Sequence, residues 1–420
     1  MVEWDSFSDQ PAHMRDKKFK RDTRKRHVDD LLISALTILL IYPIVLLRYC
    51  FGFKKRERSL KNFFGMAVNL DKEPDLTPSL VDELGVDELL VRIHMDDAEQ
   101  FDRYEAFVKT LGKRNILFVL LPSRAQIEDH ERLKHDVHAI FRRFSPYGSR
   151  FQVGNAINRI KWGFVLPKEY LLFFRTVQSV RDASFPEVKL IGPAVIDFEY
   201  HVTIRAVFNF FKIRYDALAS LLYVDRRGAP ENRQFVFDTR AKINLLRAIA
   251  DLSPKFTDKE IYITEVNWPI ADTGKYAPTS KHERVDETEY MAYMARYYLL
   301  AAATGQVKTV YWHQLIAPGY GLIDNREGIR KRAAFDAFRF MNTLLKQSTL
   351  LSFSREGDYY QAVFAKGSQK ITALWCNGST QEVAVDPKGQ LFSITGDALE
   401  HGDRIQANDL VQYLIEETHG

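Results

Sequence analysis

Several apolar, strand-like runs of the sequence end in polar or aromatic side chains that could bind or cleave a sugar. Asn155, Tyr223 and Glu265 each close or follow one of these runs. Amide and hydroxyl groups can hydrogen bond to sugar hydroxyls, and a carboxylate can attack or stabilise an oxocarbenium-like centre. Tryptophan faces can stack on the C–H surface of a pyranose ring. The other candidates at such positions are Arg92, His94, Arg124, Asn158, Trp268, Trp312 and His313.

These side chains need a scaffold that brings the ends of many strands together. Residues 62–346 alternate eight β-rich apolar runs with amphipathic stretches, which is the pattern of a (β/α)₈ barrel. A doubly wound open sheet is the alternative, but the even spacing and the lack of a glycine-rich first turn favour a closed barrel. The predicted strands are residues 63–68, 88–94, 115–121, 150–155, 188–193, 217–223, 260–266 and 308–314. In such a barrel, the residues that follow the strands line one face, where active sites lie.

The rest of the chain divides into three further parts. Residues 1–30 form a basic N-terminal tail, and residues 31–53 form a membrane-anchoring helix. Residues 350–420 contain short alternating runs separated by Gly, Asn and Asp turns, which predict a small C-terminal β-sandwich.

Composition excludes several classes of protein. The chain has 420 residues with 59 Lys and Arg against 55 Asp and Glu, a balance that argues against a nucleic-acid partner. Hydrophobic residues make up 46% of the chain, which excludes disorder as its main state. Cys50 and Cys376 are too few for a disulfide scaffold or a cysteine-rich zinc site. His94 and His313 have no acidic partner at metal-ligand spacing, so we assign no metal and no cofactor.

The stretch from Leu31 to Leu47 carries no charge and reaches the lower limit of length for spanning a bilayer. Basic clusters at Arg15–Arg26 and Lys54–Lys61 flank it, so we expect membrane lipid as a partner through residues 31–53. A buried core helix is the alternative, and a cleaved signal peptide fits poorly because no small-x-small site follows. The positive-inside rule slightly favours a cytoplasmic N-terminus and a translocated, periplasmic body. The competing interpretation is a re-entrant or interfacial helix on anionic lipid of the inner membrane, with a cytoplasmic body.

The segment IYITEVNWP at residues 261–269 resembles strand seven of the large clan of retaining glycosidases with (β/α)₈ barrels. The resemblance implies that Glu265 is the nucleophile and Tyr223 the residue that orients it. It also implies that Arg92 is the strand-two arginine and Trp312 the strand-eight aromatic of subsite −1. LIGPAVIDFE at residues 190–199 resembles the xylosidase and iduronidase branch, in which a β-sandwich usually follows the barrel.

The strand-four motif departs from the clan. The clan pattern is Gly-Asn-Glu-x-Asn with Glu as general acid/base, whereas this chain reads VGNAINRIKWGF at residues 153–164. Asn155 matches the asparagine that contacts the sugar 2-hydroxyl, but Ala156 stands at the acid/base position. The acid could come from Asp197, Glu199 or Asp225, the substrate could need no acid, or the protein could bind glycan without cleaving it. General acid/base catalysis typically raises a reaction rate by about 10²–10⁴-fold, so losing this group should slow the reaction by a large factor.

The string AINRIKWG resembles proteins of bacterial envelope-polysaccharide clusters. We therefore predict a membrane-anchored protein that acts on O-glycosyl bonds of a surface polysaccharide or lipopolysaccharide. The alternative is a non-catalytic glycan-binding or assembly subunit, or a transferase that uses an activated donor. Each of these functions requires Glu265 to face an open mouth of the barrel ringed by Trp, Tyr, Arg and Asn. Each candidate also has a structural alternative, since Glu265 could be a salt-bridged rim residue, and Trp268 and Trp312 could be core residues.

Overall fold

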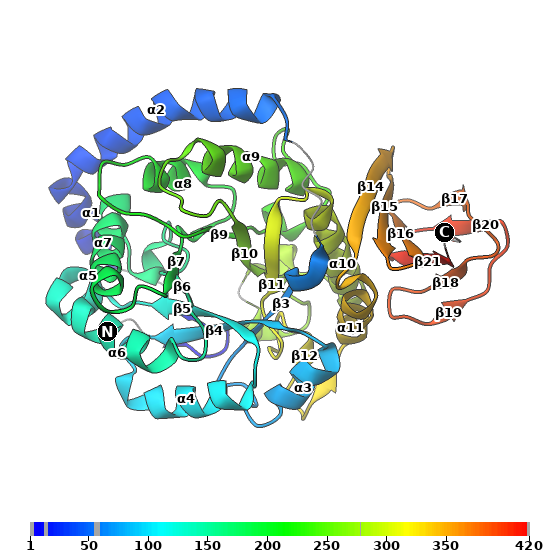
Figure 1. The fold of residues 1–420 in the computed structure, drawn as a ribbon, viewed down its shortest axis with the longest axis horizontal. Helices are drawn as coiled ribbons and strands as arrows, with labels where there is room; N and C mark the ends of the chain where they lie inside the picture. Colours follow the sequence, from blue (N-terminus) through cyan, green and yellow to red (C-terminus); the bar gives the residue numbers. More distant parts are fainter. Residues whose placement is uncertain (1–3, 12–15, 54–58, 278, 418–420) are drawn as a thin grey trace.

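The chain folds around one curled parallel sheet with helices on its outer side (Figure 1). The structure is a computed structural model that describes residues 4–11, 16–53, 59–277 and 279–417. The sheet has the order β7-β6-β5-β4-β3-β11-β10-β9-β8. Its strands are β3 (Phe64–Val68), β4 (Glu88–His94), β5 (Asn115–Leu121), β6 (Arg150–Val153), β7 (Lys189–Ile191), β8 (Val195–Ile196), β9 (Leu218–Leu221), β10 (Ile261–Val266) and β11 (Val307–Trp312). The eight predicted strands are all present.

The nine strands of the sheet correspond to eight barrel strands because the fifth is interrupted. Gly192, Pro193 and Ala194 separate β7 from β8, so that β7 pairs with β6 while β8 pairs with β9. Ile191 also bridges Ala217, just before β9. The fifth strand therefore joins the two ends of the sheet, and the predicted barrel is confirmed.

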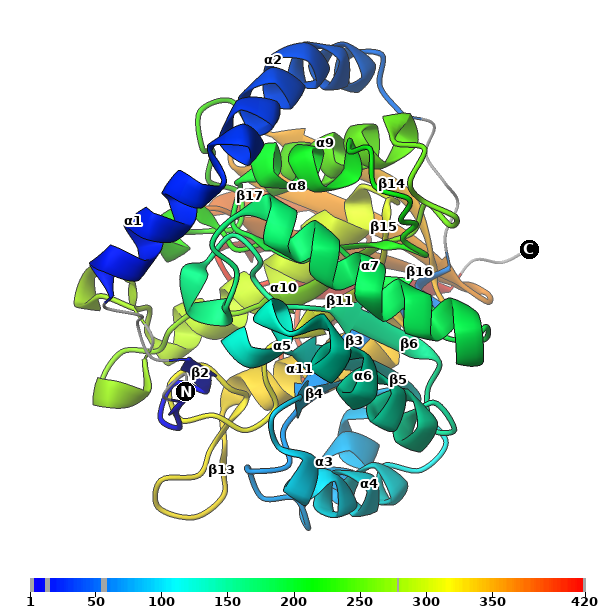
Figure 2. The same ribbon diagram turned by 90° about the vertical axis from the view of Figure 1, so that its left-hand side faces the viewer.

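Helices cover the outside of the barrel, as Figures 1 and 2 show. Amphipathic sequences form them, and some begin with a side-chain cap; Asp286 and Glu289, for example, make a capping box at the start of α10. The helices are α3 (Thr77–Leu84), α4 (Phe101–Thr110), α5 (Arg124–Glu128), α6 (His130–Phe144), α7 (Pro167–Ser184), α8 (Tyr200–Val207), α9 (Thr239–Leu252), α10 (Glu287–Ala303) and α11 (Ala333–Leu345). Their apolar faces and the outer face of the sheet form the large core.

The end of the barrel where the strands begin is closed by packing and by a buried ion pair. The side chain of Glu88 is fully buried and accepts hydrogen bonds from Arg150 at 2.7 Å and Tyr311 at 3.1 Å. Gly65 makes room for this cluster, because a Cβ atom there would lie 2.6 Å from the Tyr311 ring. In the described part of the chain, the barrel interior is open to a cavity at the other end, where the strands finish.

The C-terminal region consists of strands, in agreement with the predicted sandwich. A six-stranded sheet and a two-stranded sheet enclose a small apolar core that includes Cys376, Leu391 and Ile405. The strands are β14 (Thr349–Glu356), β15 (Tyr359–Lys366), β16 (Gln369–Cys376), β17 (Gln381–Ala384), β18 (Gln390–Phe392), β19 (Ala398–Leu399), β20 (Arg404–Ala407) and β21 (Gln412–Glu417). Cys50 is exposed and Cys376 is buried, and both thiols are free.

The N-terminal region has more structure than a tail. A short hairpin of β1 (Trp4–Asp5) and β2 (Gln10–Pro11) is followed by α1 (Lys17–Arg26) and α2 (Val28–Cys50). Helix α2 is long and apolar enough to cross a membrane, but it starts three residues before the predicted helix and lies along α8 and α9 (Figure 1). The second predicted basic cluster, Lys54–Lys61, begins in residues 54–58, which lie outside the described residues.

Candidate active site

A cavity of about 310 Å³ lies at the end of the barrel where the strands finish. It is within the size range of small-molecule sites, at the small end. The lining comes from several barrel strands, from the loops that follow them and from the N-terminal hairpin. The lining residues are Ser8, Asp9, Gln10, Arg92, Arg159, Ile160, Lys161, Trp162, Ile196, Asp197, Tyr223, Arg227, Glu265, Asn267, Thr279, His313 and Tyr320.

Glu265 is the best-connected carboxylate in this cavity. It lies on β10 next to Val266, the last residue of that strand, and its side chain is about one-tenth exposed. Its Oε1 atom accepts a hydrogen bond of 2.7 Å from the Tyr223 hydroxyl. Its Oε2 atom accepts hydrogen bonds from the Arg92 guanidinium and, at 3.4 Å, from the Asn155 amide. The parallel register of β4, β6, β9 and β10 brings these four side chains to the same end of the barrel.

These contacts decide the ionisation state of Glu265. Burial by itself would raise the pKa of the carboxyl group, but the Arg92 charge and the hydrogen bonds from Tyr223 and Asn155 outweigh it and hold the pKa at about 2. Burial and the same Arg92 charge lower the pKa of His313 to about 4. At neutral pH the cavity therefore contains the charged carboxylate of Glu265 and the neutral imidazole of His313. A charged carboxylate suits a nucleophile and not a proton donor.

The position of the clan's general acid/base carries no ionisable group. Ala156 follows Asn155 and is fully buried, with a left-handed backbone φ of 40°. Its methyl group packs in the barrel interior with Ala194 and Trp162. That this is the position of a missing acid stays a prediction from the resemblance.

Of the three carboxylates considered as substitutes for that acid, only Asp197 lines the cavity. Arg159 pairs with Asp197 at 2.7 Å and with Glu199 at 2.7 Å. Asp197 also faces Arg227 at 3.6 Å. Asp225 begins a short helical turn and does not line the cavity.

The N-terminal hairpin supplies one side of the cavity. Asp9 is buried and accepts from Arg92 through its main-chain oxygen at 3.1 Å and its carboxylate at 3.4 Å. Lys161 donates to the side-chain oxygen of Gln10. Trp4 packs edge-on against His94, with ring centroids 4.3 Å apart. The expected open mouth is therefore narrowed by residues 4–11, and Glu265 faces a cavity partly covered by its own chain.

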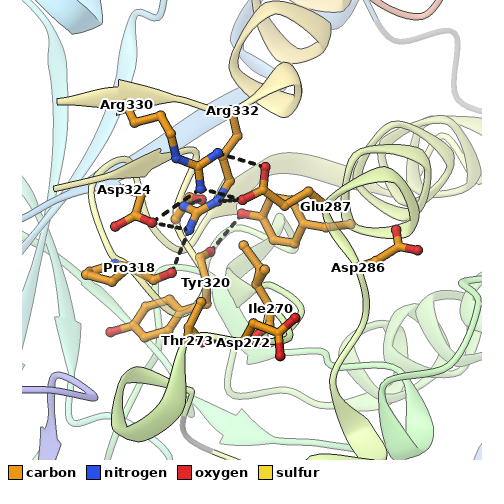
Figure 3. Close-up of polar contacts among 12 residues, drawn as sticks. Ile270, Asp272, Thr273, Asp286, Glu287, Pro318, Tyr320, Asp324, Arg330 and Arg332 are labelled. Atoms are coloured by element: carbon orange, nitrogen blue, oxygen red, sulfur yellow. Dashed lines mark hydrogen bonds and ion pairs between the residues drawn. The ribbon is translucent and has the colours of Figure 1, made fainter. Parts of the chain in front are cut away.

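A buried arginine shapes the loop that carries Tyr320 (Figure 3). Arg332 donates to the main-chain oxygens of Pro318 at 2.6 Å and Gly321 at 2.8 Å, and it pairs with Glu287 at 2.9 Å. Arg330 and Asp324 belong to the same network, on the small hairpin of β12 (Ile323–Asp324) and β13 (Arg330–Lys331). This network holds Tyr320 in the cavity wall, where its hydroxyl donates to the main-chain oxygen of Ser8 at 3.1 Å.

The two tryptophans expected to bind sugar are buried in the hydrophobic core instead. Trp268 and Trp312 are fully buried, stack on each other with centroids 5.9 Å apart, and do not line the cavity. The Trp312 indole donates to Tyr290 at 2.7 Å. The tryptophan that does line the cavity is Trp162, whose ring lies 5.5 Å from the Arg92 guanidinium. His313 is in the lining, where its ring stacks on Tyr320.

Several lining residues were not candidates from the sequence. Arg159, Lys161 and Trp162 belong to the string AINRIKWG, so the motif that drew attention to Ala156 was the available signal for them. Asp9 and Gln10 gave no signal, because the basic residues that follow them made the whole segment resemble a solvated tail.

Comparison with known proteins identifies solved structures that share this fold. No protein-family model matches the sequence, and no curated protein matches it. Among solved structures, the chain is similar to a family 39 glycoside hydrolase from Bacteroides cellulosilyticus WH2, at 15% identity and a TM-score of 0.65 over 87% of this chain and 82% of that one. It is also similar to a family 39 β-xylosidase from Caulobacter crescentus, at 13% identity and a TM-score of 0.55 over 86% and 98% of the chains.

A third similar structure is a family 30 endoxylanase from Clostridium papyrosolvens C71, at 12% identity and a TM-score of 0.57 over 87% and 98% of the chains. Identities this low show a shared fold and nothing finer. The chain has the (β/α)₈ fold of these glycoside hydrolases, which agrees with the resemblance found in the sequence.

Proposed function

We propose that this protein is a membrane-associated, glycosidase-like protein that acts on O-glycosyl bonds of a bacterial surface polysaccharide. The observation that carries the proposal is the contact of Glu265 with Arg92, Tyr223 and Asn155 at the end of a glycoside-hydrolase barrel. An endoxylanase and a β-xylosidase are among the solved structures with this fold. The envelope role rests on the string AINRIKWG and on the apolar helix α2.

In this proposal, Glu265 attacks the anomeric carbon and forms a glycosyl ester while the leaving group departs. Arg92, Asn155 and Tyr223 position the carboxylate and bind the sugar in the subsite beside it. Because Ala156 cannot donate a proton, the reaction requires a leaving group that departs as a stable anion. The best donors are therefore sugars with an activated leaving group, and the acetal bonds between sugar units of a polysaccharide, whose leaving group is a sugar alkoxide, would be cleaved slowly.

Azide provides the test of this chemistry. An activated aryl glycoside should form the glycosyl ester on Glu265, and azide should then attack the anomeric carbon and release a glycosyl azide. Full-length protein is incubated with a panel of aryl glycosides with and without azide, and the products are identified by mass spectrometry. Glu265→Gln should abolish the azide product, while the exposed control Glu327→Gln should retain it. Equal product from both variants contradicts the role of Glu265.

The second candidate function is glycan binding without cleavage, and the alanine at position 156 favours it. It predicts that no glycosyl azide forms from any donor, while oligosaccharide binding by calorimetry persists in Glu265→Gln. It also predicts that Ala156→Glu creates no activity. Formation of the glycosyl azide by the unmodified protein excludes this alternative.

A further inference from the structure

Helix α2 is covered by the barrel on one side and by nothing on the other within the described part of the chain. Val45 on its inner side is fully buried. Its outer side presents a continuous row of leucines and an isoleucine that are 44–70% exposed, which are Leu31, Leu32, Leu36, Leu39, Leu40, Ile44 and Leu47. A soluble monomer rarely leaves an apolar row of this length in water, so the row indicates a binding surface.

Two barrel loops extend this apolar row. Phe210 follows α8 and is 99% exposed, and it lines a shallow groove together with Leu36 and Leu40. Phe235 and Val236 are also strongly exposed, and the neighbouring Phe237 packs on Tyr49 near the end of α2. We call the exposed row together with Phe210, Phe235 and Val236 the α2 surface. The α2 surface combines a helix with loops of the barrel. A partner that binds the whole surface must therefore contact the barrel as well as α2.

The ends of α2 are both tied to the barrel. Near its start, Asp30 pairs with Arg205 at 2.7 Å, and both side chains are buried. Near its end, Arg48 pairs with Asp251 at 2.7 Å. A helix of 23 residues is about 35 Å long, enough to span a bilayer if it stood upright and free. Ties to one body at both ends keep it lying along that body instead (Figures 1 and 2).

The segment before α2 returns to the same body. The hairpin of residues 4–11 sits at the cavity, where Asp9 contacts Arg92 and Tyr320 contacts Ser8. A spanning α2 would put this hairpin and the barrel on opposite sides of the membrane and break all of these contacts. The arrangement therefore requires the N-terminal segment and the barrel to be on one side.

The charge next to the α2 surface identifies its partner. Lys17, Lys20, Arg21, Arg24 and Lys25 of α1 line a shallow groove that continues into Val28 and Leu31 at the start of the α2 surface. A leucine and phenylalanine surface bordered by lysine and arginine side chains matches the acyl region and the anionic headgroups of one leaflet.

We propose that the α2 surface lies in the interface of an anionic lipid leaflet, so that the protein binds one face of the membrane without crossing it. The barrel then stays on the same side of the membrane as the hairpin of residues 4–11 and the C-terminal strands. This inference specifies the membrane association proposed above and is independent of the sugar chemistry. A protein that binds vesicles but makes no glycosyl azide, or the reverse, separates the two proposals.

Vesicle binding by the full-length protein tests the surface. Co-sedimentation is measured with phosphatidylcholine vesicles with and without phosphatidylglycerol. Binding should be strong only with the anionic lipid and should weaken with salt. Phe210→Ser combined with Phe235→Ser should weaken it by at least about tenfold, because each ring would otherwise enter the apolar interface. Leu351→Ser is the matched control, a leucine 55% exposed on β14, and should change nothing.

A spanning helix predicts different results. It would place Phe210 and Phe235 in water, so the double variant would bind like the unmodified protein, and that result overturns the proposal. Ser6→Cys and Gly402→Cys, each with Cys50→Ser, are labelled with an impermeant maleimide in sealed membrane vesicles. Both positions should label from the same side; labelling from opposite sides also overturns the proposal.

The remaining alternative is that a second copy of the chain covers the α2 surface. In that case the protein would ignore vesicles and form a dimer in sedimentation velocity, and Leu36→Asp with Leu40→Asp would return it to a monomer. That combination of results also overturns the proposal. Under the proposal, the aspartate pair abolishes vesicle binding and the unmodified protein shows no dimer that depends on these leucines.

Discussion

Glu265 shows how one carboxylate can be kept charged inside a protein. Its own burial favours the neutral acid, and Arg92 on β4 with Asn155 and Tyr223 just after β6 and β9 reverses that preference. The same Arg92 contacts Asp9, so one guanidinium serves both the candidate nucleophile and the hairpin. A charged carboxylate that is already oriented needs no base to activate it, which is what a glycosidase nucleophile requires.

The depressed pKa makes a prediction about stability. The folded pKa of about 2 lies below the usual value of 4.5, so Glu265 stabilises the fold above about pH 4.5 and loses that effect as the pH falls towards 2. Glu265→Gln should therefore unfold more easily than the unmodified protein at pH 7, by roughly 3 kcal/mol. The gap should shrink near pH 3.

Urea unfolding at the two pH values measures this difference. Glu327→Gln, at an exposed loop position, is the control and should track the unmodified protein at both pH values. A gap for Glu265→Gln that stays constant with pH would mean that the carboxylate is not the group that titrates.

At the scale of elements, the hairpin of residues 4–11 limits the space in the cavity that a ligand could occupy. Strand ends supply Arg92, Tyr223 and Glu265, and a segment more than 80 residues before Arg92 supplies Asp9. The hairpin occupies space beside the very groups that would bind sugar. An occupied mouth lowers the apparent affinity for any ligand that must displace the hairpin.

Deletion of residues 2–11 should therefore open the cavity. We expect the KM for an activated aryl glycoside, or the dissociation constant for an oligosaccharide, to fall several-fold. Asp9→Asn, which keeps the hairpin but removes its charge, should have a smaller effect. An unchanged KM and dissociation constant in the deletion variant would mean that ligands reach Glu265 without moving the hairpin.

On the scale of the whole molecule, α2 packs on the barrel with one side and exposes apolar side chains on the other. Asp30 accepts from Arg205 and from the main-chain nitrogen of Lys168 in a fully buried position. Neighbouring Asp29 makes a more exposed pair with Lys168. Two adjacent aspartates thus tie the same helix to the barrel in different environments.

These two aspartates give a matched pair of variants. Asp30→Asn leaves the buried Arg205 without its counter-charge and should lower the unfolding free energy by about 3 kcal/mol. Asp29→Asn should have a much smaller effect on the unfolding free energy because water screens that pair. Thermal unfolding and limited trypsin digestion of α1 and α2 would show the difference. Equal effects of the two substitutions would contradict the buried tie.

The sequence alone determined the barrel, because eight strands with regular spacing and apolar content leave few other arrangements. It also determined Glu265, Arg92, Tyr223 and Asn155 as neighbours, since parallel strands in register carry their end residues to one face. It could not place Trp268 and Trp312, because an indole that packs in a core and one that faces a cavity follow the same pattern. Only the tertiary structure decided where residues 4–11 and α2 lie, because their contacts with Arg92, Arg205 and Asp251 join positions 83, 175 and 203 residues apart. Contacts at such separations depend on the assembled surface, and no local pattern in the chain encodes them.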